Sequence, residues 1–254
     1  MNNIGVSEKA GVRFLHFDSD WVQGAMRIAR PYALELEYTR EMMLPLLLHP
    51  TPWPRRVLLI GLGAASLLKF LWRYCPESKL TVVEIDPRVE AAARQFFKLP
   101  DDPTRIHMHF ADAADFIVDH QGTYDLILLD GFDADARAGR LDSLPFYLNC
   151  KARLAKNGIL CINLLSRRKD FGKSIARIQE AFADSDNEHT LTFPSGDDGN
   201  AIALGLIGLP PILSLQEIID ADSEFRNLSG LSLMPLISRL TFAGDFAGAK
   251  LNFA

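Results

Sequence analysis

The chain has 254 residues, of which 48% are hydrophobic and 23% charged, and its formal net charge is −5. This size and composition are typical of one large globular α/β domain, or of one such domain with a small addition. The acidic balance, without any run of arginine or lysine, argues against a nucleic-acid partner, because binding to phosphates needs clustered cations.

Signals for secretion, membrane insertion and metal binding are weak. The N-terminal residues 1–5 carry no charged-then-apolar leader pattern. The longest apolar stretch, residues 201–215, is interrupted by glycines and prolines and cannot serve as a membrane helix. Cys75, Cys150 and Cys161 are too few and too scattered for a disulfide framework or a metal site. We therefore expect a cytoplasmic protein with no metal and no membrane partner.

The first fifty residues differ from the rest. Residues 12–17 and 21–28 are short strand-like runs, residues 34–38 alternate with period two, and a short helix is expected over residues 40–48. Three prolines between residues 50 and 54 then suppress regular structure. These patterns predict a small β-rich N-terminal module over residues 1–50 and a main domain over residues 51–254.

From Arg55 onward, strand-like and helix-like segments alternate. The predicted strands are 56–60, 79–84, 105–109, 124–129 and 158–164, and the predicted helices are 64–74, 87–97, 112–119, 144–155 and 170–183. Strands that are apolar throughout predict a parallel sheet with both faces covered. Two further runs, 188–193 and 201–207, are joined by a loop too short for a crossover helix, so they should pair antiparallel. A parallel sheet that ends in an antiparallel hairpin indicates the methyltransferase-like Rossmann fold.

The end of the chain gives fewer signals. Residues 214–217 read Ser-Leu-Gln-Glu, which is a capping box and predicts the start of a last helix. The tail after Leu231 is apolar without a clear period, and the sequence suggests no function for it.

A glycine turn follows the first strand of the main domain. Gly61 and Gly63 let the backbone approach a ligand, and Glu84 ends the next strand about one helix later. This unit brings a helix N-terminus and an acidic strand tip to one edge of the sheet, where a nucleoside binds. Ser66 takes the place of the third glycine of a dinucleotide fingerprint, so the motif gains its weight from Glu84.

Two other carboxylates follow strands and precede helices. Asp86 stands before Pro87 and is interpreted as an N-cap. Asp112 either caps the helix that follows it or accepts a hydrogen bond from an adenine amino group, and the two roles are compatible.

Asp130 and Asp133 form the chemical centre that the sequence suggests. Asp130 directly follows the buried strand 124–129, and Asp133 comes three residues later. Two carboxylates this close repel each other unless a cation lies between them. The alternative is a helix cap next to an exposed loop acid. We favour a functional pair, because residues 134–143 can fold over it as a lid.

From about Phe14 to about Gly208, the sequence resembles the polyamine aminopropyltransferases, which are the spermidine and spermine synthases. The resemblance rests on residues 18–23, Glu41-Met42 with His49-Pro50, residues 83–86, Asp112-Ala113, residues 130–133 and residues 193–196. The similarity implies decarboxylated S-adenosylmethionine, or S-adenosylmethionine itself, as co-substrate and a small amine as acceptor. It also implies a possible homodimer.

The resemblance assigns roles to individual residues. Asp130 would be the catalytic base and Asp133 would bind the amine. The nucleoside would be bound by Gly61, Gly63, Glu84, Ile85, Asp112 and Ala113, with Glu84 on the ribose. The acceptor side would include Gln23, Tyr38 and Phe193.

Three positions depart from the family pattern. Ala64 stands where the glycine loop normally carries an aspartate, and Phe193 stands where a tyrosine usually faces the polyamine. In the N-terminal Y-x-E motif, Thr39 takes the tyrosine's place and Tyr38 precedes it. These departures favour a divergent, spermidine synthase-like branch.

Other functions remain open from the sequence alone. The first is a methyltransferase that uses intact S-adenosylmethionine on a small molecule and shares Glu84 and Asp112. The second is a non-catalytic protein that binds a nucleoside or a polyamine. The third is an NAD-dependent dehydrogenase, against which Ser66 and the final hairpin argue.

Overall fold

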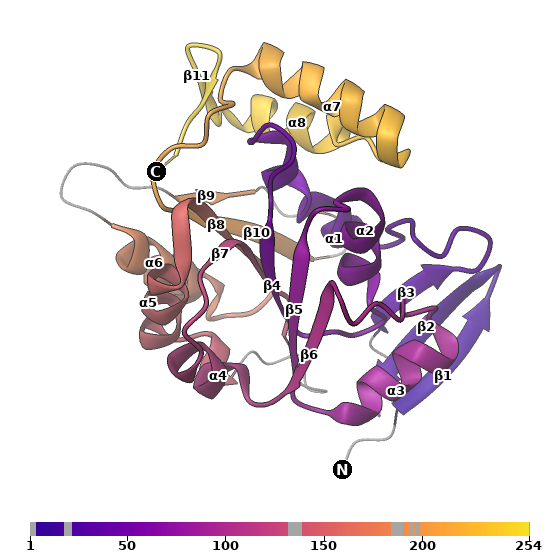
Figure 1. The fold of residues 1–254 in the computed structure, drawn as a ribbon. Coiled ribbons are helices and arrows are strands. Elements are labelled where there is room, and N and C mark those ends of the chain that lie inside the picture. Colours follow the sequence, from indigo (N-terminus) through magenta and orange to yellow (C-terminus); the bar gives the residue numbers. More distant parts are fainter. Residues whose placement is uncertain are drawn as a thin grey trace.

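The computed structural model describes residues 4–17, 22–131, 139–183, 190–193, 196 and 199–253. Within these residues, a large seven-stranded sheet has the order β6-β5-β4-β7-β8-β10-β9, and a small sheet at the N-terminus has the order β1-β2-β3 (Figure 1). The strands of the large sheet are β4 (Arg56–Ile60), β5 (Lys79–Glu84), β6 (Ile106–Phe110), β7 (Tyr124–Leu129), β8 (Leu154–Leu165), β9 (Thr190–Thr192) and β10 (Asn200–Leu206).

Strand directions match the predicted sheet. The pairs β4–β5, β4–β7, β5–β6 and β7–β8 are parallel, whereas β10 pairs antiparallel with both β8 and β9. The sheet is therefore parallel except at β10, which confirms the methyltransferase-like Rossmann fold.

Helices cover both faces of the large sheet (Figure 1). They are α2 (Ser66–Tyr74), α3 (Pro87–Phe96), α4 (Ala113–Asp119), α5 (Leu144–Ala152), α6 (Phe171–Phe182), α7 (Leu215–Ser229) and α8 (Met234–Ala243). Successive residues of β4 point to opposite faces, so Val57 and Leu59 belong to one core cluster and Leu58 and Ile60 to the other. Helices α2, α7 and α8 pack in the first cluster, and α4, α5 and α6 in the second.

Most element bounds agree with the prediction. Strands β4, β5 and β7 begin and end at the predicted residues. Helix α2 begins at Ser66 rather than at residue 64, because Ala65 has a left-handed backbone with φ of 56°. Helix α5 ends at Ala152, before the predicted residue 155, because the chain enters β8 at Leu154.

The N-terminal region differs from the prediction in its second half. The small sheet consists of β1 (Ile4–Lys9), β2 (Val12–Phe17) and β3 (Val22–Arg27), of which β1 was not predicted. The strand expected over residues 34–38 is wrong, and so is the single helix expected over residues 40–48. Instead the chain forms the short helix α1 (Glu37–Glu41) and the 3₁₀ helix η1 (Leu44–Leu47).

Local hydrogen bonds explain the difference. The Thr39 hydroxyl donates to the Leu36 carbonyl at 2.6 Å, and the Arg40 guanidinium donates to the Leu34 and Glu35 carbonyls at 2.9 Å. Side chains thus take the acceptors that a strand ladder would use. Pro45 has no backbone N–H, so a continuous helix cannot pass through it.

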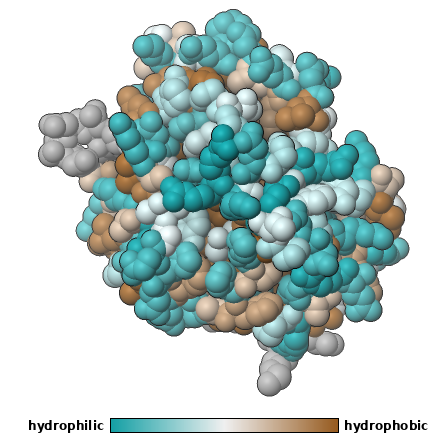
Figure 2. All heavy atoms as spheres, viewed as in Figure 1, coloured by the Kyte–Doolittle hydropathy of each residue, from teal (hydrophilic) through white to brown (hydrophobic). Residues whose placement is uncertain are grey.

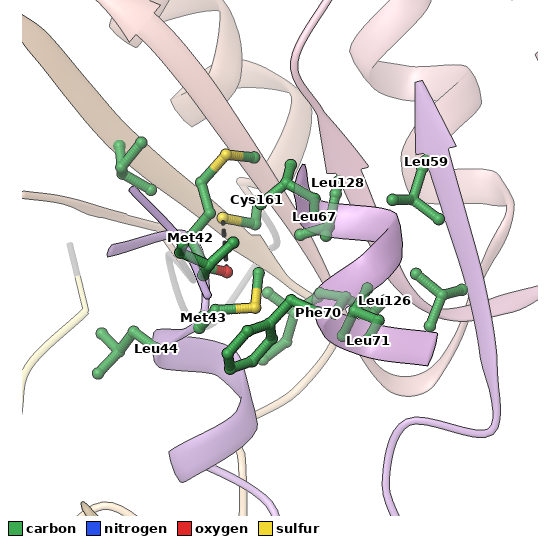
Figure 3. Close-up of a cluster of buried hydrophobic side chains, with 14 of the residues drawn as sticks. Met42, Met43, Leu44, Leu59, Leu67, Phe70, Leu71, Leu126, Leu128 and Cys161 are labelled. Atoms are coloured by element: carbon green, nitrogen blue, oxygen red, sulfur yellow. Dashed lines mark hydrogen bonds between the residues drawn. The ribbon is translucent and has the colours of Figure 1, made fainter. Parts of the chain in front are cut away.

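Residues after the small sheet join the core of the large sheet. Met42, Met43 and Leu44 belong to the same buried cluster as Phe70 of α2 and Leu128 of β7 (Figure 3). Cys161 of β8 is fully buried there, as expected of a core strand residue, and its thiol donates to the Met42 carbonyl at 3.7 Å. The small sheet itself ends at Arg27, and a division of the chain at residue 50 remains a prediction.

The C-terminal residues form a helical hairpin. The predicted capping box at Ser214 and Glu217 is present at the start of α7. Helix α8 follows, and a two-stranded ribbon, β11 (Phe246–Ala247) with β12 (Lys250–Leu251), ends the fold. Ile218, Leu236 and Ile237 are buried in the main core, so the hairpin is part of the same folded unit.

The hydropathy of the surface is consistent with burial of most apolar residues in the core. Figure 2 shows a largely hydrophilic face on which hydrophobic residues are scattered. Over the residues with described structure, we find no helix that combines the length and the hydropathy needed to span a bilayer.

A buried lysine gives the fold a pH-dependent stability. Lys69 of α2 is 1% exposed, and its ammonium donates to the Phe97 carbonyl at 2.7 Å. Burial lowers its pKa from 10.5 to about 7. Between these values the unfolded chain binds a proton that the folded chain does not bind. The free energy of unfolding should therefore rise with pH across this window, by at most about 1.4 kcal/mol per pH unit.

Comparison with Lys69→Met isolates this effect, because all other titrating groups are shared. We expect the stability of the wild type relative to Lys69→Met to increase from pH 7 to pH 10 in urea unfolding. A difference that stays constant over this range would contradict the lowered pKa.

Candidate active site

The predicted nucleoside-binding residues and Asp130 lie at one edge of the large sheet. Strand β4 lies between β5 and β7, and all three are parallel, so the turns that follow them leave the sheet on the same side. From β4, the strands β5 and β6 lie on one side and β7 and β8 on the other. Such a reversal of strand order leaves a crevice at the edge of the sheet, where ligands of α/β proteins bind.

The glycine turn after β4 is tightly enclosed. Gly61 has a φ of 90°, and a Cβ at this position would lie 2.3 Å from the Asp130 carbonyl oxygen. Gly63 has a φ of 50°, and a Cβ there would lie 3.1 Å from the Gln23 carbonyl oxygen. The turn is thus held between the end of β7 and strand β3, and only glycine fits at Gly61.

Glu84 holds the glycine turn from the neighbouring strand. Its side chain is buried, and its two oxygens accept from the backbone N–H groups of Leu62 and Asp86, both at 3.0 Å. Burial raises the pKa of this carboxyl, and the backbone hydrogen bonds oppose the shift. Each carboxylate oxygen keeps a second lone pair, which can accept from a hydroxyl group.

Ile85 presents an apolar surface beside Glu84. Its side chain is 71% exposed, although it directly follows a buried strand. An exposed isoleucine at the ligand-binding edge of the sheet offers a flat base a surface to pack on.

Asp86 and Asp112 are both helix N-caps, as the sequence suggested. Asp86 accepts from the Arg88 N–H at 2.9 Å, and Asp112 accepts from the Ala114 N–H at 2.8 Å. The second oxygen of Asp112 accepts from Arg140 at 2.8 Å. Ala113, between Asp112 and Ala114, is 8% exposed. A contact of Asp112 or Ala113 with adenine stays a prediction.

Two side chains donate hydrogen bonds to the Asp130 carboxylate. Oδ2 accepts from the Tyr38 hydroxyl at 3.2 Å, and Oδ1 accepts from the Asn163 amide at 2.8 Å. Burial raises the pKa of Asp130, while the hydrogen bonds from Asn163 and Tyr38 lower it. The two donors fix the plane of the carboxylate and leave its remaining lone pairs for a substrate.

Asn163 was not predicted as a site residue. It lies on β8, is 5% exposed, and interrupts the otherwise apolar run of residues 158–164. A polar side chain inside a buried strand needs a partner, so this interruption was the signal that could have identified it.

Tyr38 reaches Asp130 although it stands one place before the family's tyrosine. The turn of α1 directs its hydroxyl to the carboxylate. A cavity of about 20 Å³ is lined by residues that include Gln23, Tyr38, Gly61, Gly63 and Asp130. The structure therefore brings together the predicted catalytic aspartate, both glycines and two predicted acceptor-side residues.

Other predicted residues lie elsewhere. Phe193 is 2% exposed and packs in the main core, and it does not line this cavity. Glu84, Ile85 and Asp112 also lie outside the cavity lining, on the side of β5 and β6. Asp133 falls outside the described residues.

Ala64 is packed against the small sheet. It is 2% exposed, and a Cβ built on Gly24 of β3 would lie 2.6 Å from its Cβ. Among the described residues that line the cavity, Asp130 supplies the carboxylate, and position 64 supplies none.

The fold and this edge together define a class of protein. A mostly parallel sheet with β10 reversed, and a glycine turn that faces an acidic strand tip, are typical of methyltransferase-like nucleoside-binding proteins. The described part of the chain holds no group of three or more histidine, cysteine, aspartate or glutamate side chains suited to a metal ion.

Sequence comparisons narrow this class to a family. The family model for the spermine/spermidine synthase domain matches residues 36–194. The polyamine aminopropyltransferase of Neisseria meningitidis is 30% identical over 237 residues, which cover 93% of this chain and 88% of that protein. The enzyme of the same name from Chromobacterium violaceum is 30% identical over 240 residues, which cover 94% of this chain and 90% of that protein. The chain belongs to the spermine/spermidine synthase family.

Solved structures share the fold. A probable spermidine synthase from Corynebacterium glutamicum has a TM-score of 0.72 at 20% identity, with 100% of this chain and 93% of that chain covered. Human methyltransferase-like protein 13, in complex with SAH, has a TM-score of 0.66 at 21% identity and covers 78% of this chain and 94% of its own. Both confirm the methyltransferase-like architecture.

Proposed function

We propose that this protein is an aminopropyltransferase that moves an aminopropyl group from decarboxylated S-adenosylmethionine to a small amine. The observation that carries the proposal is Asp130, which two donors orient beside the glycine turn in a chain of the spermine/spermidine synthase family. A spermidine synthase of the same fold, with a TM-score of 0.64, is described in complex with the transition state analogue AdoDATO.

The reaction needs a prepared nucleophile more than an acid. The amine nitrogen forms a bond to the propyl carbon next to the sulfonium, and the carbon–sulfur bond breaks with its electron pair going to sulfur. The leaving group is the neutral thioether methylthioadenosine. An ordinary amine has a pKa of about 10, so at pH 7 about one molecule in a thousand is neutral, which adds roughly 4 kcal/mol to the barrier.

Asp130 can remove this obstacle. A carboxylate within hydrogen-bond reach attracts the ammonium and accepts its proton as the nitrogen attacks. Tyr38 and Asn163 hold that carboxylate in one orientation. We assign Asp133 to the anchoring of the amine's charge, and Gln23 and Phe193 to the acceptor side.

The nucleoside would lie along the turns after β4, β5 and β6. We assign the ribose hydroxyls to Glu84, the face of the base to Ile85, and the adenine edge to Asp112 and Ala113. Gly61 and Gly63 would allow the backbone to approach the donor.

Ala64 favours one alternative, methyl transfer from intact S-adenosylmethionine. The decarboxylated donor ends in an ammonium, which a carboxylate at position 64 would select, and this chain has none there. Incubation with each sulfonium donor and a panel of amines, followed by mass spectrometry of the nucleoside product, separates the two reactions. Methylthioadenosine supports aminopropyl transfer, S-adenosylhomocysteine would show methyl transfer, and tight binding without product would indicate a non-catalytic binder.

Glu84→Gln tests the nucleoside site. Glutamine can accept through one oxygen only, so either the Leu62 or the Asp86 N–H loses its acceptor, and the ribose loses a charged partner. We expect affinity for methylthioadenosine, measured by calorimetry, to fall about 10- to 100-fold. Asp86→Asn keeps an N-cap on the exposed side of the same turn and is the matched control. Equal losses in both variants would contradict the ribose assignment.

A further inference from the structure

We propose that the C-terminal hairpin belongs to the catalytic apparatus, and that Arg239 of α8 is a positioning residue that holds Tyr38 against Asp130. The inference rests on the proposed function, because it concerns how the catalytic carboxylate is oriented. It gives a role to the tail after Leu231, for which the sequence suggested none.

Arg239 joins the hairpin to the helix that carries Tyr38. Its Nη1 donates to Glu37 Oε1 at 2.9 Å, and its Nη2 donates to Glu41 Oε1. Glu37 and Glu41 are four residues apart on α1, with Tyr38 between them. One planar guanidinium that bridges two carboxylates across a helical turn fixes the orientation of that turn.

Helix α1 needs such an external support. It has five residues, and its N-cap residue Leu36 makes no side-chain capping hydrogen bond. A single helical turn is unfavourable in isolation, because nucleation fixes several dihedral angles for one hydrogen bond. Contacts from outside the helix therefore determine where its side chains lie.

Packing around α1 on the hairpin side is open. A cavity of about 420 Å³ separates the segment before and within α1 from the turn that joins α7 to α8. Its lining includes Leu34, Glu37 and Glu41 on one side and Ser232 and Pro235 on the other. Because the two segments leave this space between them, the ion pairs of Arg239 are specific links across the junction.

Arg239 also pairs with a buried carboxylate. The Glu41 side chain is 5% exposed. Burial, and after it the charges of Asp130 and Glu41, raise the pKa of the Cys161 thiol, so both carboxylates act on the same part of the core. Without Arg239, Glu41 would be a buried carboxylate that has lost this ion-pair partner.

A double-mutant cycle between Arg239 and Tyr38 tests the proposal. We expect Arg239→Gln to lower kcat about tenfold, with affinity for methylthioadenosine changed less than about twofold. In a Tyr38→Phe background, Arg239→Gln should lower kcat by less than about twofold more, since the link it supports is already lost. Independent, multiplicative losses in kcat would overturn the proposal.

Two variants control for stability. Arg239→Lys keeps a cation that can pair with Glu41, but an ammonium cannot bridge both carboxylates in a plane. It should therefore give an intermediate kcat. Arg226→Gln removes an exposed arginine from the same hairpin and should leave kcat unchanged. A loss in Arg226→Gln equal to that in Arg239→Gln would show a general effect of the hairpin and overturn the specific role.

A measurement without turnover separates this inference from the proposed function. The ¹³C resonance of the Asp130 carboxyl, assigned by its loss in Asp130→Asn, reports the pKa of that group directly. Tyr38 on α1 and Asn163 on β8 donate to this carboxyl and lower its pKa, against the effect of burial. Arg239→Gln should raise the pKa of Asp130, because the hydrogen bond from Tyr38, which lowers this pKa, weakens.

An unchanged titration would overturn the role of Arg239. Absence of turnover in the wild type, by contrast, would overturn the proposed function while the titration still tests Arg239.

Discussion

Asp130→Asn is expected to lower turnover at least about a hundredfold, which is the usual effect of losing a general base. Asparagine keeps the size of the side chain but cannot accept the proton of the amine. Its amide can still pair with Tyr38 or Asn163, so the surrounding structure should persist. Steady-state kinetics, with calorimetric titration of methylthioadenosine in parallel, should show a low kcat and nearly unchanged nucleoside affinity.

Asp125→Asn is the matched control on the same strand. Asp125 lies at the opposite end of β7, where one of its oxygens accepts from the Arg55 and Arg56 N–H groups, and asparagine retains such an oxygen. Turnover in this variant should equal that of the wild type. Full activity in Asp130→Asn would remove Asp130 from the role of base.

Gly61→Ala is expected to lower the free energy of unfolding by about 3 kcal/mol or more. Two costs add: an alanine at a φ of 90°, and a Cβ placed 2.3 Å from the Asp130 carbonyl oxygen. The backbone of Asp130 would have to move, so any folded protein should also lose nucleoside affinity and turnover. Urea unfolding followed by circular dichroism measures the first effect.

Gly230→Ala separates these two costs. Gly230 ends α7 with a φ of 74°, but a Cβ there would meet no atom within 4 Å. This variant should lose only about 1 kcal/mol, the cost of the left-handed backbone for alanine. If both variants lost the same stability, the close approach of Gly61 to Asp130 would not matter.

The large sheet could be predicted because its strands are apolar throughout and alternate with helix-like segments. These local signals do not depend on distant contacts, so β4, β5 and β7 have the predicted bounds. The antiparallel pairing of β9 and β10 could be predicted because the loop between them is too short for a crossover helix. Asp86 and Asp112 were identified as caps because capping is local chemistry.

The second part of the N-terminal region could not be predicted in this way. Residues 34–38 alternate as a strand does, but the Thr39 and Arg40 side chains bond the local backbone carbonyls and form a turn instead. The contacts of Tyr38 and Asn163 with Asp130 join residues 92 and 33 positions apart. No pattern within one segment reports such contacts, and the same holds for Arg239 with Glu41, 198 positions apart.

The contact between Gly24 and Ala64 has a consequence for protein engineering. The void beside Asp130 measures about 20 Å³, which is close to the space of one water molecule. An aspartate in place of Ala64 would bring three more heavy atoms into a spot already closed by the backbone of β3. Ala64→Asp alone should therefore not fit: the glycine loop and the strand β3 that covers it would have to be redesigned together.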